Sequence, residues 1–388
     1  MSLNKLTTYT RRDIFSLGIS SCAAACALPL LGQTPRTVTP QLLRTFRDTT
    51  LRAISPDGGR LCLWSTHFPI ETISVSPQGV TSVPSGRGED TLSVVVVETG
   101  SATFSMKIES PATSGSFFAE GDHLYVYAFL IAGRTPSSSH TIVNLKHGTR
   151  TDKSGPVLPI YYALGTNRLL SLEAEKEIVV TQLPEYKVIE RVSVGESPSD
   201  SWQRVTVDTV SVDRTVLIYG LDRHRVLCRS TEDLSKVLWV HHVDGRSFPT
   251  GIVAASISPN SKWVAVAAVQ KNVLSDRGNT SVSVLDVSSG KIITQIPANG
   301  AEQLAISPDG SLIAVGHRSQ YSTGETVTSV RLWDVSSGRQ IAEWEHNRQI
   351  LKSGQLSLGS FAIDGIRFTP DGQRLITSGL HTSVWRLS

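Results

Sequence analysis

Sulfur and charge are both scarce in this sequence. Among its 388 residues there are 4 cysteines and 2 methionines, and charged residues make up 18%. So few cysteines do not form a disulfide framework, and Cys62 and Cys228 each lie in an apolar run typical of a strand, where we expect small core residues. A formal net charge of only +3 argues against nucleic-acid binding. Hydrophobic residues amount to 39%, enough to form a core, so intrinsic disorder is not expected.

Local catalytic motifs are absent as well. The sequence contains no Gly-x-Ser-x-Gly elbow, no His-Glu-x-x-His, no Cys-x-x-Cys and no phosphate-binding Walker loop. His241 and His242 are adjacent, but neighbouring residues of a strand point to opposite faces, so the pair is not expected to share a metal ion. The sequence therefore predicts no catalytic residue, no metal ligand and no cofactor.

Residues 1–32 have the pattern of an export signal. Basic residues precede a charge-free stretch over 14–35, and Arg11 and Arg12 begin a segment that resembles a twin-arginine signal. An ordinary secretory signal is one alternative, and a lipid anchor on Cys22 is another. We expect cleavage after Gly32 and an exported protein, periplasmic or in the cell envelope, that meets a membrane only if Cys22 is lipidated.

Two short turns recur along the chain. In the first, a hydroxyl residue and proline precede Asp or Asn, and an apolar strand follows each copy: Ser55-Pro56-Asp57-Gly58, Ser258-Pro259-Asn260-Ser261, Ser307-Pro308-Asp309-Gly310 and Thr369-Pro370-Asp371-Gly372. Proline sets φ and the Asp or Asn completes a tight turn. The second turn, Asp-Val-Ser-Ser-Gly, begins at Asp286 and at Asp334 and also leads into a strand. Together they predict repeated units of four antiparallel strands.

The segment Val330-Arg331-Leu332-Trp333-Asp334, with the turn at Pro308 and Asp309 before it, resembles the WD-repeat β-propeller family. The resemblance implies an all-β fold of four-stranded antiparallel blades. Such blades have about 40–45 residues, and residues 33–388 divide into seven units of about 51, so we predict seven blades with enlarged loops, six or eight being alternatives. The repeat signature consists of Pro56, Asp57, Asp286, Pro308, Asp309, Trp333, Asp334, Pro370 and Asp371.

The predicted propeller is a single domain over 33–388, and its last unit supplies only three strands. An apolar stretch near 42–46 is expected to complete that unit and close the ring. The Gly-His pair usual in the family is absent before the first strands, so the ring is expected to depend more on apolar packing between blades.

Connection lengths distinguish the two rims of this propeller. The turns after first and third strands are short, whereas the connections over 66–90, 133–139, 270–280, 318–328 and 345–360 are long. Long loops on a rigid scaffold often carry function, so we predict an interaction face there. Its candidate residues are Arg87, Glu89, Asp90, Asp276, Arg277, Arg318, Tyr321, Glu325, His346 and Arg348.

Two hypotheses for function follow. The resemblance favours a non-enzymatic, monomeric platform that binds a protein or peptide partner through the long-loop rim. The alternative is a propeller enzyme, such as a lactonase-like hydrolase or a quinone-dependent dehydrogenase, with its site at the central channel. Histidine and carboxylate side chains converging on the channel mouth would favour the enzyme.

Overall fold

The structure is a computed structural model in which Met1–Arg36 and Thr37–Ser388 are separate units. The described residues all belong to the second unit, and they are 37–65, 73–76, 79–81, 90–108, 112–118, 121–132, 135–155, 161–164, 167–173, 177–194, 208–211, 215–220, 224–243, 251–270, 279–298, 300–320, 325–350, 355–356 and 363–388. The predicted export signal lies outside them. Among the described residues, no helix has the length and apolar character needed to cross a membrane.

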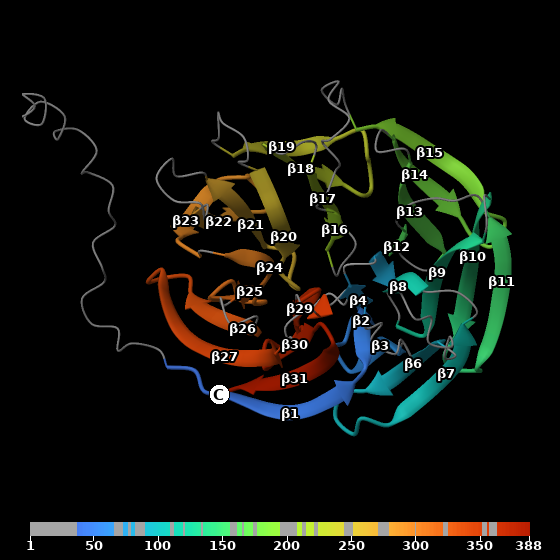
Figure 1. Ribbon diagram of the computed structural model, residues 1–388. Coiled ribbons are helices and arrows are strands. Elements are labelled where there is room, and N and C mark those ends of the chain that lie inside the picture. The colour runs from blue at the N-terminus through green and yellow to red at the C-terminus, as the bar shows by residue number, and fades with distance from the viewer. Residues whose placement is uncertain are drawn as a thin grey trace, which may run out of the picture. The chain divides into compact units, whose positions relative to one another are not determined.

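The described residues of the second unit form seven four-stranded antiparallel sheets around a central axis (Figure 1). Blade one contains β2 (Thr49–Ile54), β3 (Arg60–Ser65), β6 (Asp90–Val96) and β7 (Ala102–Ile108). Blade two contains β8 (Ala112–Phe117), β9 (His123–Ala132), β10 (Thr135–Asn144) and β11 (Thr149–Gly155). Blade three contains β12 (Tyr161–Leu164), β13 (Arg168–Glu173), β14 (Glu177–Gln182) and β15 (Lys187–Ser193).

The remaining blades follow the same order. Blade four contains β16 (Asp208–Val210), β17 (Val216–Gly220), β18 (Arg225–Ser230) and β19 (Val237–His242). Blade five contains β20 (Gly251–Ile257), β21 (Trp263–Gln270), β22 (Asn279–Asp286) and β23 (Ile292–Ile296). Blade six contains β24 (Ala301–Ile306), β25 (Leu312–Gln320), β26 (Glu325–Asp334) and β27 (Arg339–Ile350). Blade seven contains β29 (Gly365–Phe368), β30 (Arg374–Ser378), β31 (His381–Leu387) and β1 (Pro40–Arg47). The predicted all-β, seven-bladed propeller is thus confirmed.

Blade seven joins the two ends of the unit. Strand β1 pairs antiparallel with β31, from Pro40 opposite Leu387 to Arg47 opposite His381. The two strands lie side by side in Figure 1, blue against red. This pairing removes two exposed strand edges and holds the first blade against the last.

The core is divided among the junctions between blades. Seven clusters of buried apolar residues occur in the described chain, and each combines residues of two neighbouring blades. Cys62 lies in the cluster between blades one and two, and Cys228 in that between blades four and five. Both side chains are fully buried. Burial of apolar area between blades is therefore a main source of stability.

The repeated turns owe their shape to local hydrogen bonds. In each Pro-containing copy the first hydroxyl accepts a bond from the backbone nitrogen five residues later, as in Ser307 with Leu312 at 2.9 Å. The Asp or Asn side chain accepts bonds from that hydroxyl and from the following backbone. Ser211 does the same for the nitrogen of Val216 at 3.1 Å. This further copy lacks the proline, so the sequence pattern missed it.

Two of the predicted long loops are instead hairpin ends. Strands β25 and β26 stay paired out to Gln320 opposite Thr326, and β9 and β10 out to Ala132 opposite Thr135. The expectation of loops is therefore wrong for residues 135–139, 318–320 and 325–328, where cross-strand pairing continues beyond the body of the blade. Residues 133–134 and 321–324 lie outside the described residues. Strand β27 likewise runs to residue 350, so the connection predicted from 345 begins later.

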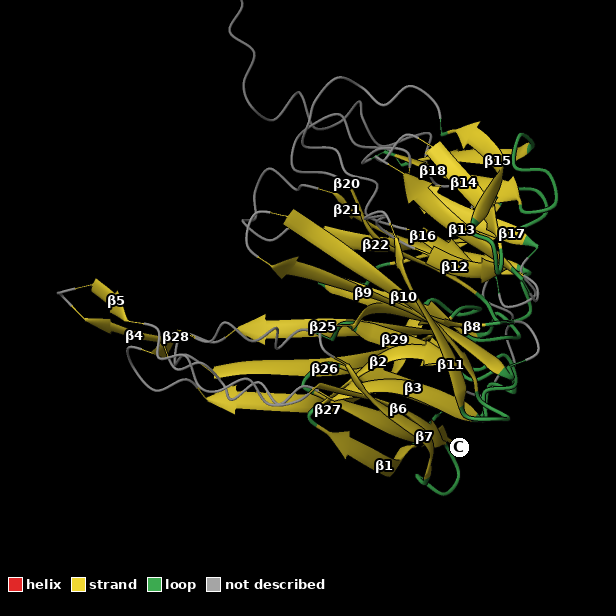
Figure 2. Cartoon of the chain, turned by 90° about the vertical axis from the view of Figure 1, so that its right-hand side faces the viewer, coloured by secondary structure: helices red, strands yellow, loops and turns green. Residues whose placement is uncertain are grey.

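Two other long connections pair with each other. A small sheet has the order β28-β4-β5, built from Gln355–Leu356, Ile73–Ser76 and Gly79–Thr81. Strand β28 follows blade six, whereas β4 and β5 lie in the insertion of blade one, and Leu356 lies opposite Ile73. In Figure 2 this sheet lies on the rim toward which β25, β26 and β27 extend.

Candidate functional site

The structure describes only half of the ten residues predicted to form the interaction face of the long-loop rim. Five of them, Arg87, Glu89, Asp276, Arg277 and Tyr321, lie outside the described residues. Asp90 begins β6 and Glu325 begins β26, both at the rim. They mark the points at which an insertion and a hairpin leave the blades.

Two arginines on the extended strands of blade six are exposed and paired with carboxylates. Arg318 on β25 contacts Glu302 at 3.1 Å. Arg348 on β27 contacts Glu345 through Nη2 at 2.7 Å and through Nε at 3.1 Å, and its hydrogen bonds lower the pKa of Glu345. Both residues lie in hydrogen-bonded strands, so the backbone that carries their side chains at the rim is part of a sheet.

His346 is buried, with 7% of its surface exposed, so it is not available to a partner. Its ring lies 4.6 Å from that of His381, at the junction of blades six and seven. Nδ1 of His346 lies 3.1 Å from the hydroxyl of Thr377, which accepts a bond from the indole nitrogen of Trp385 at 2.9 Å. Burial, and to a smaller extent His381, lowers the pKa of His346 to about 3.

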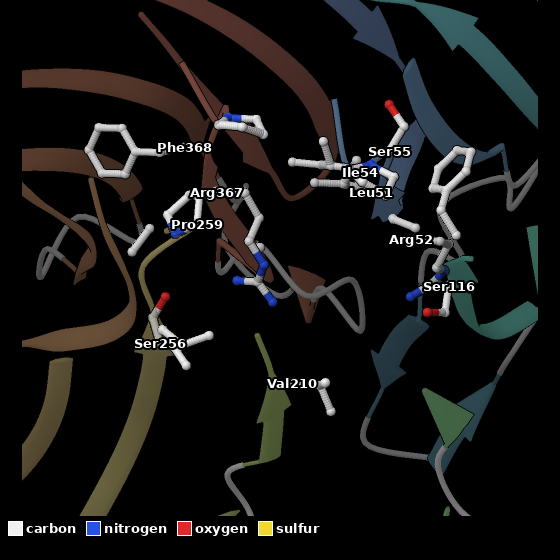
Figure 3. A pocket seen from close by; sticks show the side chains of 18 of the residues that line it. Leu51, Arg52, Ile54, Ser55, Ser116, Val210, Ser256, Pro259, Arg367 and Phe368 are labelled. Carbon is white, nitrogen blue, oxygen red and sulfur yellow. The ribbon is translucent and has the colours of Figure 1, made fainter. Parts of the chain in front are cut away.

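A cavity of about 230 Å³ occupies the central channel. It is lined by the first strands of six blades, namely β2, β8, β16, β20, β24 and β29 (Figure 3). The lining residues are spread over the sequence from Leu51 to Pro370, so the cavity forms only when the blades close into a ring. Buried hydroxyls of Ser116 and Ser256 are part of its lining.

Within the described part of the chain, three charged residues line this cavity. Arg52 belongs to β2, Arg367 to β29, and Asp364 directly precedes β29. In Figure 3 Arg52 and Arg367 lie on either side of the cavity. Among the described residues, the lining therefore carries two guanidinium groups and one carboxylate, an excess of positive charge.

Arg52 is placed by an irregularity in the sheet. In the pairing of β2 with β3, Leu51 lies opposite Leu63 and Ala53 opposite Cys62, so Arg52 is the extra residue of a β-bulge. Bulges redirect side chains. The first strands of blades two, five and six have the same irregularity, so it belongs to the repeat. The guanidinium carbon of Arg52 lies 4.4 Å from the centre of the Trp64 ring, a cation–π contact. Burial lowers the pKa of Arg52, opposed by the charge of Asp364.

Asp364 and Arg367 are also anchored. The backbone nitrogen of Asp364 donates to the carbonyl of Ser378 at 2.9 Å, and the Ser378 hydroxyl bonds to the Asp364 carboxylate. That hydroxyl also accepts a bond from the nitrogen of Leu51 at 2.8 Å, which ties blade seven to blade one. Burial raises the pKa of Asp364, while Ser378 and Arg52 oppose the rise. Arg367 donates through Nη1 to the carbonyl of Ile366 at 2.7 Å.

Sequence reasoning did not find these three channel residues. The available signal was their position, two to five residues before a repeated turn, which is within or beside the first strand of a blade. Among the described residues, no three His, Cys, Asp or Glu side chains come together in a group that would hold a metal ion.

The fold and the channel define the chain as a seven-bladed β-propeller. No protein-family model and no curated protein matches the sequence. Among solved structures, the chain is similar to the β-propeller domain of Cps50 (Swd1) from Myceliophteria thermophila, with a TM-score of 0.59 and 14% identity. The alignment covers 90% of this chain and 100% of that domain, and at this identity the similarity concerns the fold.

Proposed function

We propose that this protein is an exported, non-enzymatic platform, a degenerate WD-repeat propeller whose long-loop rim binds a protein or peptide partner. The observation that carries the proposal is the enlargement of one rim. The hairpins of blades two and six extend beyond the other strands of their blades. On the same rim, two segments that are distant in the sequence pair as the small sheet of β28, β4 and β5. Surface extensions on a rigid scaffold are typical of binding sites.

The charges of β27 bear on the mode of contact. This strand has 12 residues and forms the outer edge of blade six. It carries Glu343, Glu345 and Arg348, and charged side chains on an edge strand disfavour the addition of another strand. We therefore infer that a partner docks through side chains of the hairpins, with the protein acting as a monomer.

The test shortens two connections of this rim. Residues 271–278 and 319–327 are each replaced by Asn-Gly, because Gln270 lies opposite Asn279 and Arg318 opposite Thr328, the spacing that a two-residue hairpin turn requires. Native and shortened proteins are then used to capture partners from the envelope fraction of the producing cells, with identification by mass spectrometry. The proposal expects the shortened protein to fold and to lose the partners.

A matched control changes the opposite rim. Ser288→Ala with Ser336→Ala alters the turns after third strands and is expected to leave capture unchanged. Melting temperatures of all variants establish that the ring is intact. If the folded, shortened protein captures the same partners as the native protein, the rim is not the binding face.

Export rests on the N-terminal pattern and has a separate test. The double change Arg11→Lys, Arg12→Lys is expected to retain the protein inside cells that export the native chain. The intact mass of the exported protein is expected to correspond to a start at Gln33. A mass that includes fatty acid on Cys22 would instead indicate a lipid-anchored form, and export of the double variant would indicate an ordinary secretory signal.

A further inference from the structure

Arg52 is half-buried, and part of its guanidinium group lacks a hydrogen-bond acceptor among the described residues. Its Nε is inaccessible to solvent and has no hydrogen-bond partner. Within the described part of the chain, its contacts are the ring of Trp64 and the more distant charge of Asp364. An unsatisfied buried donor is costly, and Arg52 as a whole keeps some exposure where it lines the cavity, so its guanidinium group can donate to an anion that enters there.

The surroundings of Arg52 hold it in place at the cavity wall. The bulge at residue 52 removes its side chain from the regular alternation of β2, and Trp64 supports the guanidinium from one face. Gly115, on the first strand of blade two, also lines the cavity. A Cβ at position 115 would lie 3.3 Å from the Cβ of Arg52, so a larger residue there would crowd the base of the arginine side chain.

The cavity has the charge and size for a small anion. In the described lining, Arg367 adds a second guanidinium from β29, and Asp364 compensates only one of the two positive charges. A guanidinium fork binds carboxylate and phosphate groups through paired hydrogen bonds. About 230 Å³ is below the range of pockets for drug-sized ligands, which restricts the occupant to a compact molecule.

We propose that the central channel is a binding site for a small organic anion, in which Arg52, assisted by Arg367, holds a carboxylate or phosphate group. Asp364 and the serine hydroxyls of the lining would meet hydroxyl or amine groups elsewhere on the same molecule. This site is distinct from the long-loop rim, so it does not depend on the partner-binding proposal.

Calorimetric titration of the full chain tests the site with two anionic probes, inorganic phosphate and L-malate, and with glycerol as a neutral probe, all at constant ionic strength. Saturable binding of at least one anion, and none of glycerol, is expected. Arg52→Met is expected to weaken that binding at least tenfold. Arg191→Met, which removes an exposed arginine paired with Glu177 at 2.9 Å on blade three, is expected to leave it unchanged.

Arg52→Lys is a second variant, which retains the positive charge but lacks the paired donors of the guanidinium group. If Arg52→Met does not fold, the affinity of Arg52→Lys for the anion is the test. Weaker binding by the lysine variant supports the proposal. Binding of phosphate alone would assign a phosphate-bearing ligand, and binding of malate alone a carboxylate. The proposal is overturned if neither anion binds saturably to the native protein, or if the Arg52 variants bind as the native protein does.

Discussion

Mild acid is expected to destabilise the propeller through the histidine pair between blades six and seven. His346 has a folded-state pKa of about 3, lowered by burial and by His381, against an ordinary value of 6.5. The unfolded chain therefore takes up a proton that the folded chain does not. The contribution of His346 to stability is complete above about pH 6.5 and is lost as the pH falls from there toward 3.

The size of the effect follows from the two pKa values. Linkage gives a loss of about 2 kcal/mol in the free energy of unfolding between pH 7.5 and pH 5. For a domain of this length, that corresponds to a fall of about 3 °C in melting temperature. His381, whose pKa is also lowered, mainly by burial, acts in the same direction.

The assay is urea denaturation at pH 7.5 and pH 5 with the native protein, His346→Gln and His147→Gln. Glutamine can accept a bond from Thr377 but does not titrate, so His346→Gln is expected to lose about 2 kcal/mol less than the native protein on acidification. His147→Gln, which removes an exposed histidine, is expected to behave as the native protein. Equal acid sensitivity of the native protein and His346→Gln would refute the reasoning.

Two further predictions concern glycine and cysteine. Gly290 and Gly338 occupy the same turn of successive blades, at φ of 66° and 63°, but a Cβ at 290 would lie 2.6 Å from Cγ of Trp239, whereas a Cβ at 338 would meet nothing within 4 Å. Gly338→Ala is expected to cost about 1 kcal/mol and Gly290→Ala about 2 kcal/mol more by urea denaturation, and equal losses would contradict the steric argument. Burial raises the thiol pKa of Cys62 and of Cys228 to about 12, so peptide mapping after iodoacetamide at pH 8 should find both unmodified in the native protein and alkylated in urea. Prompt native alkylation would show that the blade junctions open.

The repeat was readable from the sequence because its chemistry is local. Pro56 and Asp57 form a turn with residues that are their neighbours in the chain, and Asp334 accepts bonds from Ser336 and Ser337 within the same turn. The copy at Ser211 was missed because its hydroxyl bond to Val216 is preserved while the proline is not. Sequence patterns detect the residues of a turn, whereas the fold requires only its hydrogen bonds.

The candidate site was less predictable. The sequence places Arg318 at the start of the long connection over 318–328, but the ladder of β25 and β26 continues past it. His346 was assigned to the same face, although blade seven covers it. Polar composition suggests exposure, but a neighbouring blade can bury a polar residue by supplying a hydrogen bond, as Thr377 does for His346.

The sequence alone determined the strand class and the repeat, because turn residues and apolar alternation act over a few neighbouring positions. The family resemblance and the chain length predicted seven blades, with six or eight as alternatives, and the structure has seven. Only the tertiary structure decided which distant residues meet. Ring closure places blade seven beside blade one, which brings Asp364 and Arg367 into the same cavity as Arg52 and pairs β28 with β4. The bulge at Arg52 likewise arises from the register of β2 on β3, which depends on two strands fitting together rather than on either segment by itself.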